Sequence, residues 1–236
     1  MPKTLLLAAA ALTLPGAAAG RSVTNINSHD GWLSVQTLGE TMVAGSGRIA
    51  RQRRDVGAFG SVHVTGPTRL ELVVGPRHSV EIAADDNLVG KITSRVRGGE
   101  LRIATDGSFR TRTTPVVRIT MPSVGQVQMI GSGDGRIEGL SGGAVKLVST
   151  GSGDLSASGR AASLTTDLYG TGSADLSRVS APDVRVSVYG SGDARVYATG
   201  VLKAAVFGSG TIAYSGRPAH VSRSIHGSGD ILPINQ

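Results

Sequence analysis

Recurring aspartates are the residues of this chain whose type and spacing could perform chemistry. Asp134 and Asp154 each follow a Gly-Ser-Gly unit, and 20 residues separate them. If the two units stack as neighbouring strands, their carboxyl groups lie about 4.8 Å apart. Retaining glycosidases hold two carboxyl groups about 5–5.5 Å apart. The pattern therefore leaves open a polysaccharide-active enzyme, although a repeated turn would stack aspartates in the same way.

The other chemical motifs give weaker signals. Residues 139–143 (GLSGG) match G-x-S-x-G, but a nucleophile elbow needs a helix after the serine, and no helical pattern follows. The five histidines lack the spacing of a metal site. An aspartate column could bind calcium, but the known calcium repeat has a period of about nine residues. We therefore assign no catalytic residue, metal site or cofactor.

The aspartates belong to a repeat in the second half of the chain. Six Gly-x-Gly units follow one another at spacings of 18 to 20 residues. The repeated turn comprises Gly131, Gly133, Asp134, Gly151, Gly153, Asp154, Gly170, Gly172, Gly190, Gly192, Asp193, Gly208, Gly210, Gly227, Gly229 and Asp230. Because glycine reaches positive φ without steric cost, aligned glycines can form the same sharp corner in every coil of a stack.

Between the glycines, apolar and polar residues alternate. The run 184–188 (VRVSV) is typical of a strand with one buried face. Strands joined by glycine turns at a period near 19 residues predict an all-β fold, a right-handed β-solenoid or β-helix. Its thin core agrees with the low number of aromatic residues, 8 of 236. A helical bundle is disfavoured by the 34 glycines, and a disulfide framework is excluded by the absence of cysteine.

The N-terminal segment has the features of a secretory signal peptide over residues 1–19. Lys3 precedes an apolar run at residues 5–14, and three alanines at 17–19 form a cleavage pattern. No later segment is apolar enough to span a membrane, so we expect an exported chain, periplasmic or extracellular, without a transmembrane segment once mature. Residues 20–44 are expected to be a linker or N-terminal cap. Residues 45–236 are expected to form the solenoid domain, with irregular coils first.

Positive charge is concentrated in the first half of the chain. Residues 48–118 contain 13 basic and 7 acidic residues, whereas residues 119–236 contain 9 and 8. We expect the basic face to lie around Arg48, Arg51, Arg53, Arg54, Arg95, Arg97, Arg102, Arg110 and Arg112. Such a field favours an anionic glycan or envelope surface as partner. Nucleic acid is disfavoured by export and by the lack of interleaved aromatic residues.

A second candidate ligand surface consists of aromatic residues. Tyr169, Tyr189 and Phe207 each precede a glycine unit, so they occupy equivalent places in successive coils. Stacked rings at these positions could form a strip for binding sugars. They could equally serve as a packing ladder between coils.

The order of these motifs resembles a bacterial family, the putative auto-transporter adhesins with a head GIN domain. The resemblance covers about residues 45–232 and depends on residues 45–47, Arg54, Phe59, 62–66, 70–75, 80–88, 99–103, 117–122 and the glycine repeats. It implies an exported β-helix with a surface or envelope role, and it supplies no catalytic residues. We therefore expect an exported, non-enzymatic adhesin or cell-envelope binding or structural protein. The alternative is a polysaccharide-active β-helix enzyme using the stacked aspartates.

Overall fold

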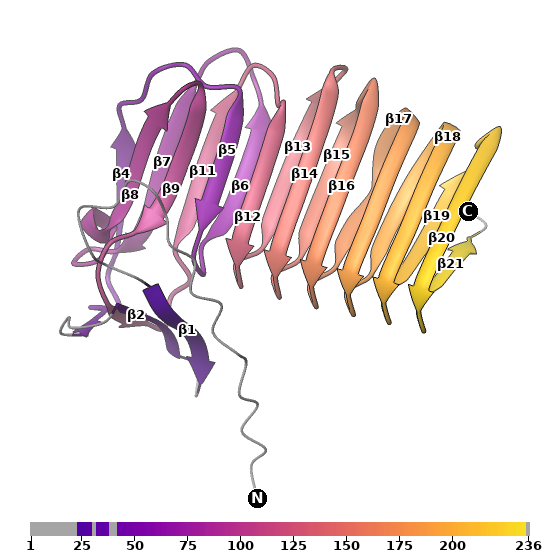
Figure 1. The fold of residues 1–236 in the computed structure, drawn as a ribbon. Coiled ribbons are helices and arrows are strands. Elements are labelled where there is room, and N and C mark those ends of the chain that lie inside the picture. Colours follow the sequence, from indigo (N-terminus) through magenta and orange to yellow (C-terminus); the bar gives the residue numbers. More distant parts are fainter. Residues whose placement is uncertain (1–22, 30–31, 38–41, 235–236) are drawn as a thin grey trace, which may run out of the picture.

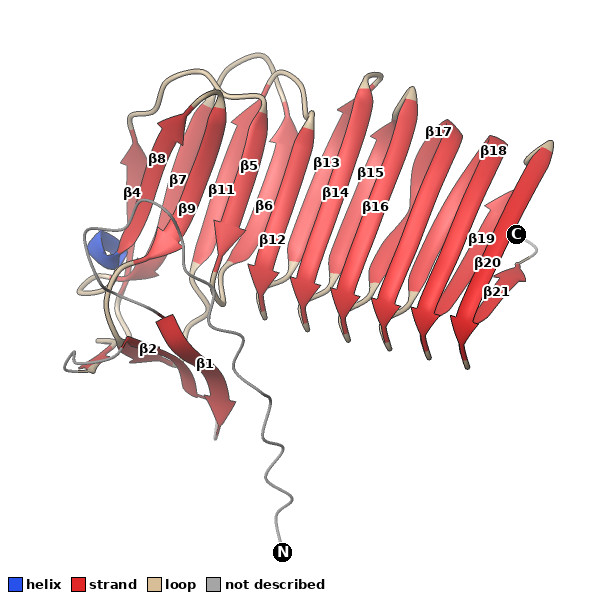
Figure 2. Ribbon diagram, viewed as in Figure 1, coloured by secondary structure: helices blue, strands red, loops and turns tan. Residues whose placement is uncertain are grey.

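The computed structural model describes residues 23–29, 32–37 and 42–234. This part of the chain is almost entirely β-structure, with one short 3-10 helix, η1 (Val89–Lys91) (Figure 2). The strands stack into an elongated solenoid (Figure 1), which confirms the predicted fold class. The predicted signal peptide at residues 1–19 lies outside the described residues. Within the described ranges, no helix has the length and apolar character needed to cross a membrane.

The regular half of the solenoid has two columns of parallel strands. The first column contains β12 (Gln126–Gly131), β14 (Ala144–Gly151), β16 (Ser163–Gly170), the second halves of β17 (Ala174–Gly190) and β18 (Ala194–Gly208), and β20 (His220–Gly227). The second column contains β13 (Gly135–Ser141), β15 (Leu155–Arg160), the first parts of β17 and β18, β19 (Thr211–Gly216) and β21 (Asp230–Pro233). Each glycine unit is the corner that joins a first-column strand to a second-column strand.

The N-terminal coils do not stack in chain order. One coil consists of β5 (Ser61–Thr65) and β6 (Arg69–Val74). In the first column, β5 lies between β9 (Glu100–Thr105) and β12. In the second column, β6 lies between β11 (Val116–Met121) and β13. Beyond β11, the second column continues with β7 (Ser79–Asp85), which pairs antiparallel with β11, and with β4 (Ile49–Arg54), which pairs antiparallel with β7. Beyond β9, the first column continues with β8 (Ile92–Arg97), which pairs antiparallel with β9. These antiparallel pairings are the physical basis of the irregular first coils.

The core lies between the two columns and is built from alternate residues of each strand. In the second column, Leu72 lies between Ile119 and Ile137 in register, and all three are at most 1% exposed. Farther along the column, Ala174 and Ala194 occupy inward-facing positions. Because the two sheets lie close together, small and branched aliphatic residues fill most of the core.

A small separate sheet packs beside the first coils. It contains β1 (Val23–His29), β2 (Trp32–Thr37), β10 (Phe109–Thr111) and β3 (Val43–Ala44), in that order. Figure 1 labels β1 and β2 of this sheet. Phe109 and Leu88 form a buried cluster under this sheet together with Val35. The described strands of the segment 20–44 therefore belong to this small sheet and are attached to the solenoid through β10.

Candidate functional site

The glycine corners bring successive coils into direct backbone contact. At Gly151, φ is +131°, and a Cβ atom would lie 2.0 Å from the carbonyl oxygen of Gly131. At Gly153 a Cβ atom would lie 2.1 Å from the carbonyl oxygen of Gly133, although the φ of Gly153 is not in the left-handed region. The backbone N–H of Ser152 donates to the Gly131 carbonyl oxygen. The first glycine is thus required by both φ and space, and the second by space alone.

The aspartates of the repeat hold the next coil in place. The N–H of Asp154 donates to Oδ1 of Asp134 over 3.2 Å, and the N–H of Ser173 donates to Oδ1 of Asp154 over 2.9 Å. Asp193 accepts from Thr211 N–H in the same way. One oxygen of each carboxylate is therefore occupied by the backbone of the following coil, which is a structural role.

A shallow groove of about 650 Å³ runs along the aspartates of the repeat. Its charged lining residues are Arg69, Glu71, Asp134, Arg136, Asp154, Asp175, Asp193 and Arg195. The hydrogen bond from Ser177 lowers the pKa of Asp175; burial opposes the shift, and the charges of Arg178 and Arg195 add to it. Oδ1 of Asp134 and Oδ1 of Asp154 each accept a backbone hydrogen bond from the next coil, and Asp134 also pairs with Arg69 over 3.7 Å. The groove does not support the polysaccharide-active enzyme as an alternative.

We expect the Asp154→Ala variant to lose about 1 kcal/mol of unfolding free energy, because the Ser173 N–H loses its acceptor. The Asp154→Asn variant keeps a side-chain oxygen at this position and should stay within about 0.5 kcal/mol of the parent chain. Urea unfolding followed by circular dichroism measures both values. Equal losses in the two variants would show that charge, and not this hydrogen bond, is what the coil needs.

The aromatic ladder is a continuous stack of rings. The ring centroids of Tyr169 and Tyr189 are 4.7 Å apart, those of Tyr189 and Phe207 are 4.8 Å apart, and His226 continues the stack at 4.9 Å. The planes are within 9° of parallel, so neighbouring rings cover each other's faces. Apart from the outer faces of the two end rings, only ring edges are exposed along the ladder. A sugar that stacks on an aromatic residue needs a free face. This geometry therefore favours a packing role over a sugar-binding strip.

The N-terminal end of the solenoid carries four free arginines. The strands β4 and β8 are the outer strands of the two columns here, and each pairs with only one neighbour in the described part of the chain. Arg51 and Arg53 on β4, and Arg95 and Arg97 on β8, are exposed. Within residues 42–234 none of the four forms an ion pair. We call these four residues the arginine end.

The two pairs of the arginine end lie on opposite faces. Gln52 is in register with the buried Ile82, so its neighbours Arg51 and Arg53 face outward from the second column. Val96 is in register with the buried Leu101, so Arg95 and Arg97 face outward from the first column. The end therefore presents two guanidinium groups on each side of a thin structure.

Four other arginines of the basic half have partners among the described residues, unlike those of the arginine end. Arg54 donates from Nη2 to the carbonyl oxygens of Val89 and Ile92 over 2.7 and 2.9 Å, which ties β4 to η1 and β8. Arg102 is paired with Glu100. Arg110 and Arg112 lie over the ring of Trp32, at 5.1 and 4.4 Å from its centroid. Sequence reasoning located the basic half but could not identify which of its arginines stay unpaired.

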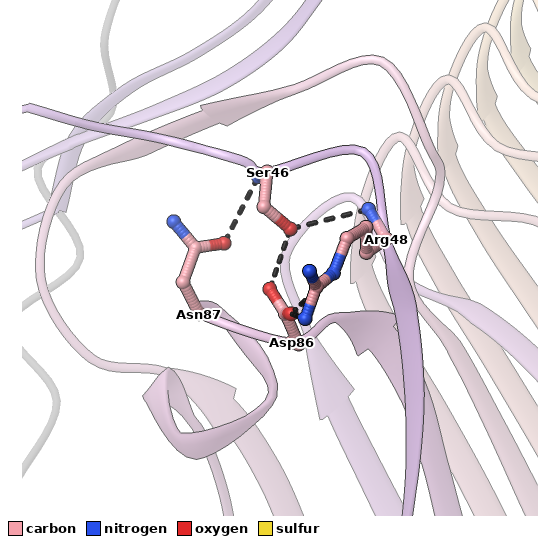
Figure 3. A network of polar contacts seen from close by, with 4 residues as sticks. All are labelled: Ser46, Arg48, Asp86 and Asn87. Atoms are coloured by element: carbon pink, nitrogen blue, oxygen red, sulfur yellow. Dashed lines mark hydrogen bonds and ion pairs between the residues drawn. The ribbon is translucent and has the colours of Figure 1, made fainter.

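Arg48 is also neutralised, by a network just before β4 (Figure 3). The Ser46 hydroxyl donates to Oδ1 of Asp86, the Ser46 N–H donates to Oδ1 of Asn87 over 3.0 Å, and Nε of Arg48 donates to Oδ2 of Asp86 over 3.1 Å. The Ser46 hydrogen bond, and to a smaller extent Arg48, hold the pKa of Asp86 below its ordinary value despite some desolvation. The ionised Asp86 therefore fixes the start of β4.

Comparison with known proteins agrees with the fold. The chain covers 100% of a solved structure described as a putative adhesin from Bacteroides fragilis, with 24% identity, 81% of this chain aligned and a TM-score of 0.68. A putative lipid binding protein from Parabacteroides distasonis aligns over 83% of this chain and 100% of its own, with 20% identity and a TM-score of 0.52. No curated protein matches the chain.

The family comparison covers most of the solenoid. Residues 58–218 match the family model described as putative auto-transporter adhesin, head GIN domain. This range includes five of the six glycine units and ends within the turn after β19. The match confirms the resemblance noted in the sequence, and the chain belongs to the family of putative auto-transporter adhesins with a head GIN domain.

Proposed function

We propose that this chain is an exported, non-enzymatic binding module that adheres to an anionic glycan of a cell envelope through the arginine end. The observation that carries the proposal is a set of four exposed arginines that form no ion pair within the described residues: Arg51, Arg53, Arg95 and Arg97. The description of the family as adhesins supports a binding role.

The chemistry of arginine suits this ligand class. A guanidinium group stays charged at any physiological pH and donates two parallel hydrogen bonds to a carboxylate or phosphate group. Because the two pairs lie on opposite faces of a thin end, a flexible polyanion can contact both pairs. A flat bilayer cannot contact two opposite faces of the solenoid at the same time, so it would not reach both arginine pairs. The geometry therefore favours a flexible polymer over a lipid surface as the ligand.

The proposal is tested with the chain from residue 20 onward and a polyuronate such as polygalacturonate, with neutral dextran as the control polymer. Arg51, Arg53, Arg95 and Arg97 are all replaced by glutamine, and we expect binding to weaken at least about tenfold, equal to about 1.4 kcal/mol. The parent chain should bind more weakly as salt concentration rises, because exposed charges are screened.

A matched control changes the same net charge elsewhere. Its four glutamine substitutions replace exposed arginines of the regular coils: Arg160, Arg178, Arg185 and Arg195. This variant should bind polygalacturonate nearly as well as the parent chain. Equal weakening by both sets of substitutions would reduce the effect to net charge and would contradict a site at the arginine end. Binding to phosphatidylglycerol vesicles but not to the polyuronate would contradict the glycan class.

A further inference from the structure

The C-terminal end of the described solenoid is an open cross-section of its core. Val221 and Ile225 on β20 are in register with Leu202 and Val206, which are completely buried and face inward. In the last coil the same inward positions are 39% exposed at Val221 and 46% exposed at Ile225. In the described part of the chain, no further coil covers these apolar side chains.

The backbone of this coil is also open on one side. Among the described strands, β20 pairs only with β18, and β21 only with β19, so the outer N–H and C=O groups of both strands lack strand partners. A free edge of this kind pairs readily with another strand unless charge, proline or a covering segment blocks it. Pro233 interrupts the edge of β21, but β20 has no proline over its eight residues.

The opposite end of the solenoid also has outer strands with one neighbour each, β4 and β8, but its core is covered and its strand edges carry charge. Arg54 faces the core end and bonds to the carbonyl oxygens of Val89 and Ile92, and Val56, Val89 and Val96 pack against the core. The arginine end then adds like charges on both outer strands. Two such ends would repel each other, so the N-terminal end is protected against strand addition. On β20 the one inward-facing charge is Arg223, whose guanidinium is bonded to the Tyr214 hydroxyl.

We propose that a second copy of this chain covers the open end, tail to tail, with β20 of the two copies pairing antiparallel. The two copies are related by a two-fold axis that is perpendicular to the long axis of the solenoid and to its sheets. With this symmetry, the strands of the second copy continue both columns at once, and the dimer is closed and isologous. Val221 and Ile225 of each copy then become buried in a continuous core. This inference does not depend on the anionic ligand of the arginine end.

Side-chain alternation restricts the register of this pairing. Residues opposite each other in an antiparallel pair point to the same face, so Val221, Arg223 and Ile225 must lie opposite inward-facing residues. Of the two registers that overlap nearly all of β20, one places Arg223 opposite the partner's Arg223, which is unfavourable. The other places Ser224 opposite the partner's Ser224 and Arg223 opposite the partner's Ile225. In each copy the Arg223 guanidinium already donates to the hydroxyl of Tyr214.

The charges at the corners of the last coils complement this arrangement. Arg217 lies in the turn before β20, and Asp230 directly follows the glycine corner after it. Both are exposed, and neither forms an ion pair within the described chain. Antiparallel pairing brings the start of β20 in one copy beside its end in the other, so each Arg217 meets the partner's Asp230. Two ion pairs related by the two-fold axis result.

Sedimentation of the chain from residue 20 onward, over a range of concentrations, tests the dimer. We expect a monomer–dimer equilibrium whose dissociation constant rises at least about tenfold in the Ile225→Lys variant. The Leu232→Lys variant is the matched control, because Leu232 is 48% exposed but in register with the outward-facing Ala213. Circular dichroism verifies that both variants stay folded. A monomer at all concentrations, or open-ended filaments, would overturn the proposal.

Charge exchange and cross-linking test the orientation. Arg217→Asp and Asp230→Arg should each weaken the dimer, and the double variant should restore it. The chain has no cysteine, so Ser224→Cys should give a disulfide-linked dimer on oxidation, because opposed Cα atoms of antiparallel strands lie within disulfide reach. Ser187→Cys, in the same column two coils earlier, should not. Equal cross-linking of the two cysteine variants, or no rescue by the double variant, would overturn the tail-to-tail geometry.

Discussion

Replacing Gly151 with alanine is expected to lower the free energy of unfolding by about 4 kcal/mol, a loss that few single substitutions reach. The added Cβ would lie 2.0 Å from the carbonyl oxygen of Gly131, and φ at this position is +131°. The coil cannot move away, because the Ser152 N–H also bonds to that carbonyl oxygen and the neighbouring strands are in register. Relief of the overlap therefore separates two coils.

Three control glycines divide this effect into its causes. Gly153→Ala tests the overlap alone, because its Cβ would lie 2.1 Å from the Gly133 carbonyl oxygen without a left-handed φ. Gly142→Ala tests φ alone, since φ is +84° and nothing lies within 4 Å; about 1–2 kcal/mol should be lost. Gly143→Ala has neither problem and should stay within about 0.5 kcal/mol.

Urea unfolding monitored by circular dichroism ranks the four variants. We expect Gly151→Ala to be the least stable, followed by Gly153→Ala, Gly142→Ala and Gly143→Ala. If Gly151→Ala were no worse than Gly142→Ala, the corner would depend on backbone conformation only, and close coil contact would not be the reason for glycine.

Replacing Phe109 with alanine is expected to cost about 3–5 kcal/mol, the usual range for a buried phenylalanine. Phe109 is completely buried, and with Leu88 and Val35 it forms the cluster that joins the small sheet to the first coils. Its strand β10 connects β2 with β3. The loss should therefore fall mainly on the small sheet and leave the stacked coils folded.

Trp32 makes this local effect measurable. It is the only tryptophan of the chain, and its ring lies against Arg110 and Arg112. Arg110 is in β10, and Arg112 directly follows this strand. In the Phe109→Ala variant, tryptophan emission should change at a lower urea concentration than circular dichroism. The control variant Leu72→Ala truncates a core residue of the solenoid, so it should lower the urea concentration at the midpoint of the circular dichroism transition. Coincident transitions in the Phe109→Ala variant would show one cooperative unit instead of two.

The two proposals have a joint consequence. A tail-to-tail dimer places its two arginine ends at opposite extremes of a doubled solenoid. Each copy could then bind a separate segment of an anionic polymer, and the second binding event would benefit from a raised effective concentration. Loss of the dimer through Ile225→Lys should reduce apparent affinity for an immobilised polyuronate without changing the affinity of one end in solution.

Several features of the fold could be predicted from the sequence because they repeat locally. A stack of coils must turn in the same way in every coil, so the corner residues recur at the period of the coil, and glycine marks them. Alternation of apolar and polar residues likewise reports one buried face of each strand. The same regularity, with the ordered motifs of residues 45–122, was enough to indicate the family that the comparison confirms.

The candidate site depends on contacts between distant segments, which no local pattern records. Insertion of the β5–β6 coil between later coils, and the capping of the core end by Arg54, become visible only in the tertiary structure. Which arginines are free depends on whether a carboxylate, a carbonyl oxygen or an aromatic ring comes within reach, as Asp86 does for Arg48. The sequence by itself determined the solenoid, because its corners repeat; the tertiary structure decided its ends, because there the repeat stops and long-range packing replaces it.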